Sequence, residues 1–203
     1  DISASREGRS TFTKLVERIA DRINIPFTVG GGISTIDDAS RLLDAGADKI
    51  TVNSAAVADP ELISQIAARY GSQFVVAAID ARLMDDGIWH VTTHGGSRVS
   101  DRELFTWATE VESRGAGEIL FTSMNHDGTR NGYPCDTYSR LASMLTIPVI
   151  ASGGAGSVDD IAEVFEEGHA DAALAASIFH YGEITIAELK RQLAARGIPV
   201  RTV

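Results

Sequence analysis

Short apolar runs alternate with longer amphipathic segments along most of this chain. The apolar runs are continuous and too short for helices, which is typical of parallel strands buried on both faces. The segments between them carry apolar residues at helical spacing, as at Ile36, Ala39 and Leu42. This alternation predicts an α/β protein with a parallel sheet. The predicted strands are 27–29, 50–52, 74–79, 118–122, 149–151 and 172–175.

One part of this pattern occurs twice. Residues 25–57 and 147–179 align with each other, with Gly31-Gly32 over Gly153-Gly154 and Asp48 over Asp171. Each copy reads as a strand, a glycine loop, a helix, a second strand and a small polar loop. Solenoid repeats have periods of about 20–50 residues, so a repeat this distant indicates a duplicated half-domain instead.

Helix starts are marked by a recurring capping pattern. Ser or Thr followed three residues later by Asp or Glu is typical of a helix N-terminus. This predicts helices after Thr35, Ser100, Ser157 and Thr185, and Asp59-Pro60 predicts a further start with a first-turn proline. A helix is also expected over 12–23 and another ends near 141–145, while a small hairpin with a turn at 85–87 is inserted within 83–99.

The count of strand–helix units indicates a barrel. Eight such units take about 250 residues, so a chain of 203 residues holds about six and a half of them. We therefore expect an α/β TIM barrel with internal half-barrel duplication, forming a single domain over 1–203. Because the chain opens at Asp1 on what reads as the tail of a strand, we expect it to be N-terminally incomplete by about fifty residues.

Composition narrows the function classes. A formal net charge of −10 argues against nonspecific binding to nucleic acid or anionic membranes. Cys135 is the single cysteine, so no internal disulfide can form and a cytoplasmic location is expected. We find no signal peptide, no apolar run of about 18 residues and no metal-ligand spacing among the five histidines. We expect no metal and no cofactor, and for Cys135 a small, partly buried structural role.

The two glycine loops predict two phosphate sites. Glycine lacks a Cβ, so backbone N–H groups can approach an anion closely, and the helix that follows adds a favourable dipole. Alternatively, glycine there only permits tight turns. The same glycine pair in the same context of both copies favours phosphate binding.

Candidate acid–base residues lie where strands end. In barrels of this class the carboxyl ends of the strands carry the active site. Asp80 directly follows six apolar residues, although a structural capping role is the alternative. Asp127 precedes Gly128, which is also a common turn pair. Lys49 and Glu118 lie at strand starts, on the opposite face, where charges usually form solvated ion pairs.

Several motifs together resemble a known family, the cyclase subunit of imidazole glycerol phosphate synthase from histidine biosynthesis. They are FTVGGG at 27–32, GADK at 46–49, VNSAAV at 52–57, RGAGEIL at 114–120, DGT at 127–129, ASGGAG at 151–156 and ALAASIFH at 173–180. The resemblance covers essentially the whole chain. It implies a (βα)8 barrel that takes ammonia from a glutaminase subunit and converts a ribulosyl bisphosphate nucleotide into imidazole glycerol phosphate and an aminoimidazole carboxamide ribotide.

The resemblance also implies roles for individual residues. Asp80 matches a catalytic general acid–base, with Asp1 and Asp127 as supporting carboxylates. Lys49 and Glu118 match part of a charged ring that gates ammonia entry, on the face where the glutaminase docks to form a heterodimer. One phosphate site is implied at Gly31, Gly32, Asn53 and Ser54, and the other at Gly128, Gly153, Gly154, Ala176 and Ser177.

Two departures and two alternatives accompany this interpretation. The family's other catalytic aspartate lies on a first strand that this chain does not include, and Pro134-Cys135 stands where the family usually runs Gly-Tyr-Asp. The first alternative is the sister sugar-phosphate isomerase of the same pathway, which uses no ammonia. The second is a truncated barrel without catalysis. We expect the parent protein to be the cyclase and these 203 residues alone to be inactive.

Overall fold

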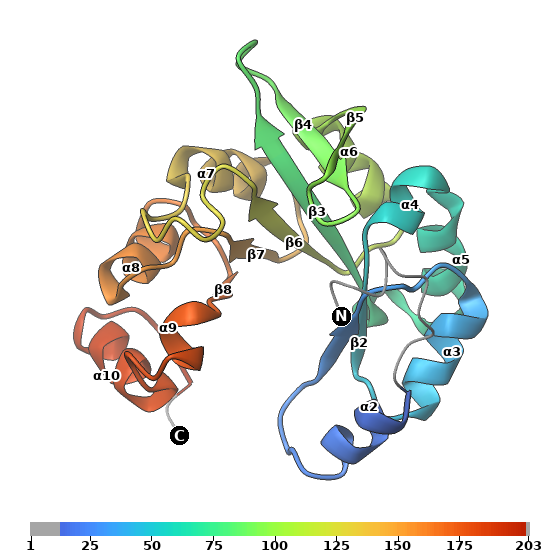
Figure 1. Ribbon diagram of the computed structural model, residues 1–203, viewed down its shortest axis with the longest axis horizontal. Helices are drawn as coiled ribbons and strands as arrows, with labels where there is room; N and C mark the ends of the chain where they lie inside the picture. Colours follow the sequence, from blue (N-terminus) through green and yellow to red (C-terminus); the bar gives the residue numbers. More distant parts are fainter. Residues whose placement is uncertain (1–12, 202–203) are drawn as a thin grey trace. The chain divides into compact units, whose positions relative to one another are not determined.

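The computed structural model describes residues 13–201. The described chain divides into two compact units, unit 1 up to residue 119 and unit 2 from residue 120. Strands alternate with helices in both units (Figure 1). Asp1 lies outside the described residues, as do the proposed strand tail and the first residue of the helix expected over 12–23.

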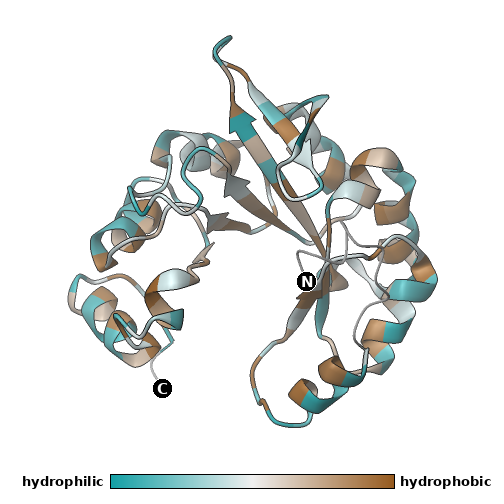
Figure 2. Cartoon of the chain, in the orientation of Figure 1, coloured by the Kyte–Doolittle hydropathy of each residue, from teal (hydrophilic) through white to brown (hydrophobic). Residues whose placement is uncertain are grey.

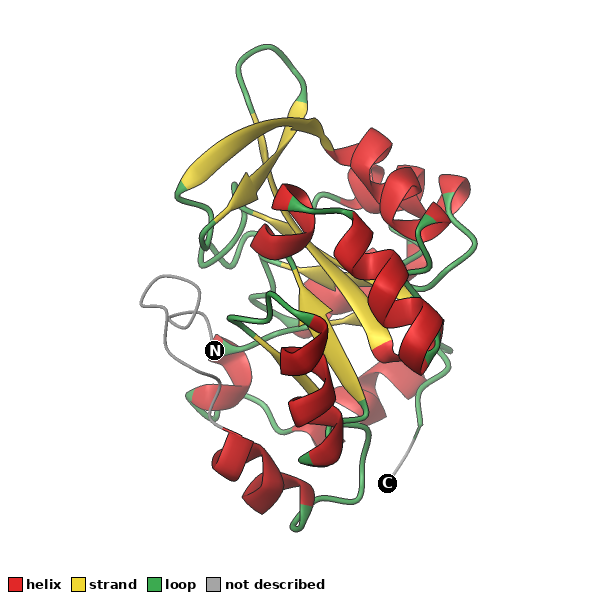
Figure 3. Cartoon of the chain, turned by 90° about the vertical axis from the view of Figure 1, so that its right-hand side faces the viewer, coloured by secondary structure: helices red, strands yellow, loops and turns green. Residues whose placement is uncertain are grey.

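Unit 1 is built on three parallel strands. Their order is β1-β2-β3, with Thr28 opposite Lys49 and Ile50 opposite Val75. Helices α3 and α5 cover one face of these strands (Figures 1 and 3). The elements are α2 (Thr13–Ala20), β1 (Thr28–Gly30), α3 (Ile36–Asp44), β2 (Lys49–Val52), α4 (Ser54–Ala58), α5 (Glu61–Tyr70), a 3-10 turn (Ser72–Phe74), β3 (Val75–Leu83), β4 (Trp89–Thr93), β5 (Arg98–Glu103), α6 (Leu104–Ser113) and the first residues of β6 (Glu118–Ser123).

Unit 2 continues the same alternation. Strands β6, β7 and β8 are neighbours in that order, and β7 and β8 are parallel, with Ile150 opposite Ala172. The elements after β6 are α7 (Cys135–Met144), β7 (Val149–Ser152), α8 (Val158–Glu166), β8 (Ala172–Ala173), α9 (Ser177–His180) and α10 (Ile186–Ala195). The predicted α/β class is therefore confirmed, while the prediction of a single domain stays a prediction.

The duplication extends to side-chain contacts. Thr35 and Ser157 each accept a hydrogen bond from the backbone N–H three residues on, and Asp38 and Asp160 each reach back to the cap residue, so both predicted capping boxes are present. The equivalent residues Asp48 and Asp171 also make the same type of contact, each accepting from a backbone N–H at the start of a strand. Asp48 Oδ2 accepts from Phe27 N–H at 2.7 Å and Asp171 Oδ2 from Val149 N–H at 2.9 Å. Each carboxylate ties the start of one strand to that of its neighbour.

Each unit buries apolar residues between its helices and strands. In unit 1 the strand residues Ile50 and Ile79 and the helix residues Leu42 and Ile63 are fully buried. In unit 2 Tyr138 is fully buried, and its hydroxyl donates to Phe121 O and accepts from Ser152 N–H. Brown and teal stretches alternate along the helical ribbons, because each helix has one buried side (Figure 2).

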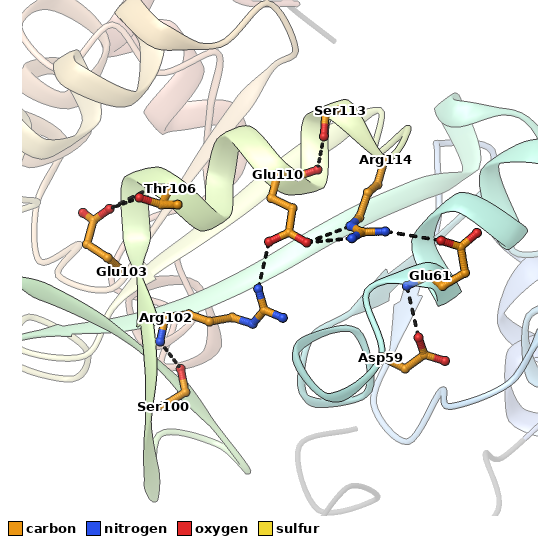
Figure 4. A network of polar contacts seen from close by, with 9 residues as sticks. All are labelled: Asp59, Glu61, Ser100, Arg102, Glu103, Thr106, Glu110, Ser113 and Arg114. Atoms are coloured by element: carbon orange, nitrogen blue, oxygen red, sulfur yellow. Dashed lines mark hydrogen bonds and ion pairs between the residues drawn. The ribbon is translucent and has the colours of Figure 1, made fainter.

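A polar network joins three elements of unit 1 (Figure 4). The Glu110 carboxylate on α6 accepts from Arg102 of β5 at 2.8 Å and from Arg114 at 2.9 Å, and Arg114 reaches Glu61 of α5 at 3.3 Å. The Arg102 guanidinium also lies 4.2 Å from the ring centre of Trp107. The network holds the second hairpin strand against α6 and α6 against α5.

Three local predictions need correction. Asp80 does not follow a strand end, because β3 runs on to Leu83 by pairing with β4, which places Asp80 opposite Thr92. Ser100 does not cap α6. It lies in β5 and its hydroxyl donates to Val91 O, while Glu103 caps the helix by accepting from Thr106 N–H. The two small polar loops instead begin the short helices α4 and α9.

The start of α5 is shifted by one residue from its prediction. The helix begins at Glu61, and Pro60 occupies the cap position. The Asp59 carboxylate still accepts from Glu61 N–H at 3.2 Å. Asp59 therefore caps the helix through its side chain, as predicted, although it lies one residue before the N-cap position.

Candidate active site

In unit 1, two predicted site residues contact each other directly. Asn53 follows β2, and Asp80 lies in β3 just beyond the last parallel pair of these strands, Val52 opposite Ala77. The Asn53 side-chain amide donates to Asp80 Oδ2 at 2.9 Å. Asn53 Oδ1 is buried and makes no hydrogen bond to the described residues. The carboxyl end of β2 and the part of β3 just beyond the parallel pairing thus bring together a carboxylate and a polar group that still needs a donor.

The hairpin fixes the backbone beneath Asp80. Thr92 is fully buried on β4, and its hydroxyl donates to Asp80 O at 3.1 Å. Because Asp80 and Thr92 are also opposite each other in the antiparallel register, the main chain at Asp80 is held from β4 while Asn53 holds the side chain from β2. This arrangement suits a carboxylate that must keep one orientation.

The glycine loop of unit 1 begins where the backbone of Gly30 lies close to the side chain of Thr51. A Cβ on Gly30 would lie 1.8 Å from Oγ1 of Thr51, its partner on β2, so only glycine leaves room there. Gly31 and Gly32 follow with φ of 98° and 72°. Their counterparts Gly153 and Gly154 have φ of 86° and 125°, which shows that both copies use the same backbone region.

In unit 2 the second glycine loop contacts the loop that carries Asp127 and Gly128. Gly132 N–H donates to Gly154 O at 2.9 Å, and a Cβ on Gly154 would lie 2.0 Å from Gly132 O. A Cβ on Gly153 would lie 3.4 Å from Asp127 Cβ. Asp127, Gly153 and Gly154 are therefore neighbours in this unit, while Ala176 and Ser177 lie at the start of α9.

The capping boxes supply negative charge of their own at two of the helix N-termini in the phosphate prediction. The dipole of a helix N-terminus favours any nearby negative charge. In α3 that charge is supplied by the chain itself, because Asp38 accepts from Ser34 N–H and Thr35 N–H at 3.0 Å. Asp160 does the same for Gly156 N–H and Ser157 N–H of α8 at 2.8 Å. Phosphate binding at the glycine loops and at the residues that begin α4 and α9 stays a prediction.

Lys49 and Glu118 meet at the other end of the strands. Lys49 begins β2 and Glu118 begins β6, and their side chains form a partly exposed ion pair. The prediction that Lys49 and Glu118 lie at strand starts is therefore confirmed. An ion pair agrees both with the ordinary stabilising role and with the gate that the resemblance implies.

The pKa values of two further groups near these loops, His126 and Cys135, are shifted so that burial favours the neutral form. Burial lowers the pKa of the His126 imidazole, whose Nδ1 lies 2.8 Å from Ser123 Oγ. Burial, followed by the charges of Glu163 and Glu167, raises the pKa of Cys135 to about 11. Cys135 is thus a partly buried thiol at the first position of α7, after Pro134, which supplies no side-chain cap.

Two absences hold for residues 13–201. No group of three or more His, Cys, Asp or Glu side chains is arranged to bind a metal ion. None of the helices in this range is long and apolar enough to cross a membrane.

The structure also adds residues that the sequence did not single out. His94 lies in the turn after β4, where its backbone N–H donates to Ser54 Oγ at 2.9 Å. The Gly95-Gly96 pair that follows is a turn signal and could have located it. Thr92 has no comparable signal, because a threonine in a strand is ordinary.

Taken together, the alternating units, the glycine loops and the carboxylate–amide pair define an α/β protein of the (βα)8-barrel class. Comparison with known proteins gives the family. The family model described as "Histidine biosynthesis protein" matches residues 1–185. The chain belongs to this family.

The relatives agree with this assignment. The chain is 58% identical to the imidazole glycerol phosphate synthase subunit HisF of Phocaeicola vulgatus, over 99% of this chain and 80% of the relative. The HisF subunits of Bacteroides fragilis and Flavobacterium johnsoniae are 57% and 52% identical over the same shares. The resemblance drawn from the motifs is thereby confirmed.

Proposed function

We propose that this chain carries the cyclase chemistry of imidazole glycerol phosphate synthase. In this reaction ammonia and a ribulosyl bisphosphate nucleotide give imidazole glycerol phosphate and an aminoimidazole carboxamide ribotide. The observation that carries the proposal is the 58% identity to a HisF subunit over 99% of the chain. The relatives compared above are all synthase subunits, which favours the cyclase over the sister isomerase.

Asp80 is the proposed acid–base group. Joining ammonia to a carbonyl carbon removes protons from nitrogen and delivers protons to the oxygen that leaves as water. A carboxylate held in one orientation can carry such transfers. Asn53 supports this role because its amide bonds one carboxylate oxygen, Asp80 Oδ2.

The phosphates are assigned to one site in each unit. In unit 1 we propose Gly31, Gly32, Asn53 and Ser54 as the binding residues. In unit 2 we propose Gly128, Gly153, Gly154, Ala176 and Ser177, with Asp127 beside them as a supporting carboxylate. The support is the same positive φ at equivalent glycines and the nearness of Asp127 to Gly153. Asp1 stays a predicted supporting residue.

The test is ammonia-dependent turnover of the bisphosphate nucleotide. Asp80→Asn should abolish it, whereas Asp85→Asn, an exposed turn carboxylate of the same hairpin, should leave it unchanged. Turnover is measured for the chain alone and for the chain extended at its amino end by the corresponding segment of the Phocaeicola vulgatus relative. Activity only in the extended form supports both the cyclase and the expected inactivity of the 203 residues.

Other outcomes separate the alternatives. Isomerase turnover in the extended form would establish the sister enzyme. Phosphate binding without either activity would establish a barrel without catalysis. Turnover by the 203 residues alone at the rate of the relative would contradict only the expected inactivity.

A glutaminase subunit is the proposed partner. We place its docking at the amino ends of the strands, where Lys49 and Glu118 form their ion pair. Lys49→Met should lower glutamine-dependent turnover of the reconstituted pair more than ammonia-dependent turnover, because free ammonia in solution has other routes to the site. Lys190→Met on α10 is the control. Equal losses with both nitrogen sources would contradict a gating role. The cytoplasmic location stays a prediction.

A further inference from the structure

The turn that joins β4 and β5 has an unusual backbone. His94 has φ of 55°, and Gly95 and Gly96 continue with 64° and 80°. Left-handed conformations are ordinary for glycine but unfavourable for a residue with a Cβ, so something must hold His94 there. Such residues concentrate at functional sites.

Hydrogen bonds that involve side chains hold this turn. His94 N–H donates to Ser54 Oγ at 2.9 Å, and Ser97 Oγ donates to His94 O at 2.8 Å. The His94 ring nitrogen Nδ1 lies 3.0 Å from Thr93 Oγ1. Of these contacts, the first is the one that leaves the hairpin, since Ser54 begins α4.

This contact determines what the Ser54 hydroxyl can do. A serine hydroxyl has a single proton to donate and two lone pairs to accept with. Because Ser54 Oγ accepts from His94 N–H, one of its lone pairs faces the turn. The hydroxyl proton of Ser54 therefore points away from the turn and can be donated to another group. Because Asn53, the preceding residue, bonds Asp80, the same short segment connects the carboxylate, the hydroxyl and the hairpin turn.

We propose that the turn His94–Ser97 is a positioning element of the phosphate site in unit 1. His94 acts through its backbone amide, which orients the Ser54 hydroxyl as a donor to a phosphate oxygen. This inference rests on the proposed function, since it takes Ser54 to be a phosphate ligand. It assigns His94 to substrate binding without contact between its imidazole and the substrate.

The test is a series of substitutions that separates backbone from side chain. His94→Gly and His94→Asn keep the amide and tolerate positive φ, whereas His94→Val keeps the amide but disfavours this conformation. The probe is inorganic phosphate, titrated while the backbone amide signals of Ser54 and Ser177 are followed by NMR. Ser177 is the internal control, because it reports the predicted site of unit 2.

We expect the dissociation constant read at Ser54 to stay within about twofold for Gly and Asn, and to rise about tenfold for Val, the effect of losing one well-oriented hydrogen bond. The value read at Ser177 should not change in any variant. In a Ser54→Ala background, the Val substitution should add nothing, which keeps the inference testable if His94→Val alone folds poorly.

Three results would overturn the inference. If the dissociation constant read at Ser54 is the same in all three His94 variants as in the unsubstituted chain, the turn has no positioning role. The proposed function would be unaffected by that result. A rise for Gly and Asn equal to that for Val would show that the imidazole itself binds phosphate. No response of Ser54 to phosphate in the unsubstituted chain would overturn both the inference and the phosphate assignment of unit 1.

Discussion

The side-chain amide of Asn53 donates a hydrogen bond to the carboxylate of Asp80, 27 residues further along the chain, at 2.9 Å. Asn53 directly follows β2 and Asp80 lies in the neighbouring strand β3, just beyond the last parallel pair, Val52 opposite Ala77. This bond restrains the one residue to which the cyclase proposal assigns proton transfer.

Because Asn53 both orients Asp80 and is a proposed phosphate residue, replacing it should lower turnover as well as substrate affinity. For Asn53→Ala in the extended chain we expect about a tenfold loss in kcat, because the carboxylate loses its orienting donor. Asn53→Asp should cost more, since it places a second carboxylate beside Asp80. Steady-state kinetics with ammonia measure both, and Asn24→Ala, an exposed residue before β1, is the control. An unchanged kcat in both Asn53 variants would rule out a positioning role.

The equivalent aspartates of the two copies should contribute similarly to stability. Asp48→Ala and Asp171→Ala each remove one charged acceptor from a backbone N–H at a strand start. We expect each to lower the free energy of unfolding by about 1 kcal/mol. Asp48 lies in unit 1 and Asp171 in unit 2, so the losses should add in the double variant.

Urea denaturation measures these changes, with Asp44→Ala at the exposed end of α3 as the control. A loss confined to one of the two aspartates would show that the copies have diverged in this contact. A double variant that loses much more than the sum would show coupling between them.

The network around Glu110 should stabilise unit 1 through its shared carboxylate. Glu110→Gln leaves Arg102 and Arg114 without the charge that both contact (Figure 4). Because the three side chains are about one-third exposed, we expect a loss of only about 1 kcal/mol, and a smaller one at high salt. Thermal unfolding at low and high salt tests this, with Glu166→Gln, an exposed residue of α8, for comparison. A loss independent of salt would point to packing rather than charge.

Cys135 should react slowly with alkylating reagents. Burial and the nearby carboxylates of Glu163 and Glu167 raise the pKa of its thiol to about 11, so at pH 8 its thiolate fraction is roughly a hundredfold below that of a free cysteine. The iodoacetamide rate should rise with pH up to about 11. Glu163→Gln should raise the rate at pH 8, whereas Glu183→Gln should not.

The raised pKa of Cys135 also predicts how the free energy of unfolding changes with pH. The folded thiol holds its proton to a higher pH than the unfolded one, so the contribution of Cys135 is complete below the unfolded pKa of about 8.5. It is lost as pH rises toward about 11. The Cys135→Ser variant should therefore show a shallower fall in unfolding free energy over this range. An equal fall in both proteins would contradict the raised pKa.

The sequence by itself determined the features whose partners are close along the chain. The capping boxes of α3 and α8 were predicted correctly because Thr35 and Asp38, or Ser157 and Asp160, are three residues apart. The strand and helix alternation was predicted because burial on both faces of a strand leaves a continuous apolar run. The glycine pairs could be aligned because the two copies retain the same order of residues.

Only the tertiary structure decided features that depend on distant pairing. Asp80 lies inside β3 rather than after it because β4 supplies a partner, and Ser100 lies in a strand because β5 pairs with β4 in turn. The contacts of Asn53 with Asp80 and of Ser54 with His94 join residues 27 and 40 positions apart. The local hydrophobic periodicity cannot predict which strand end contacts which turn. Such contacts depend on how the whole unit packs around its buried core.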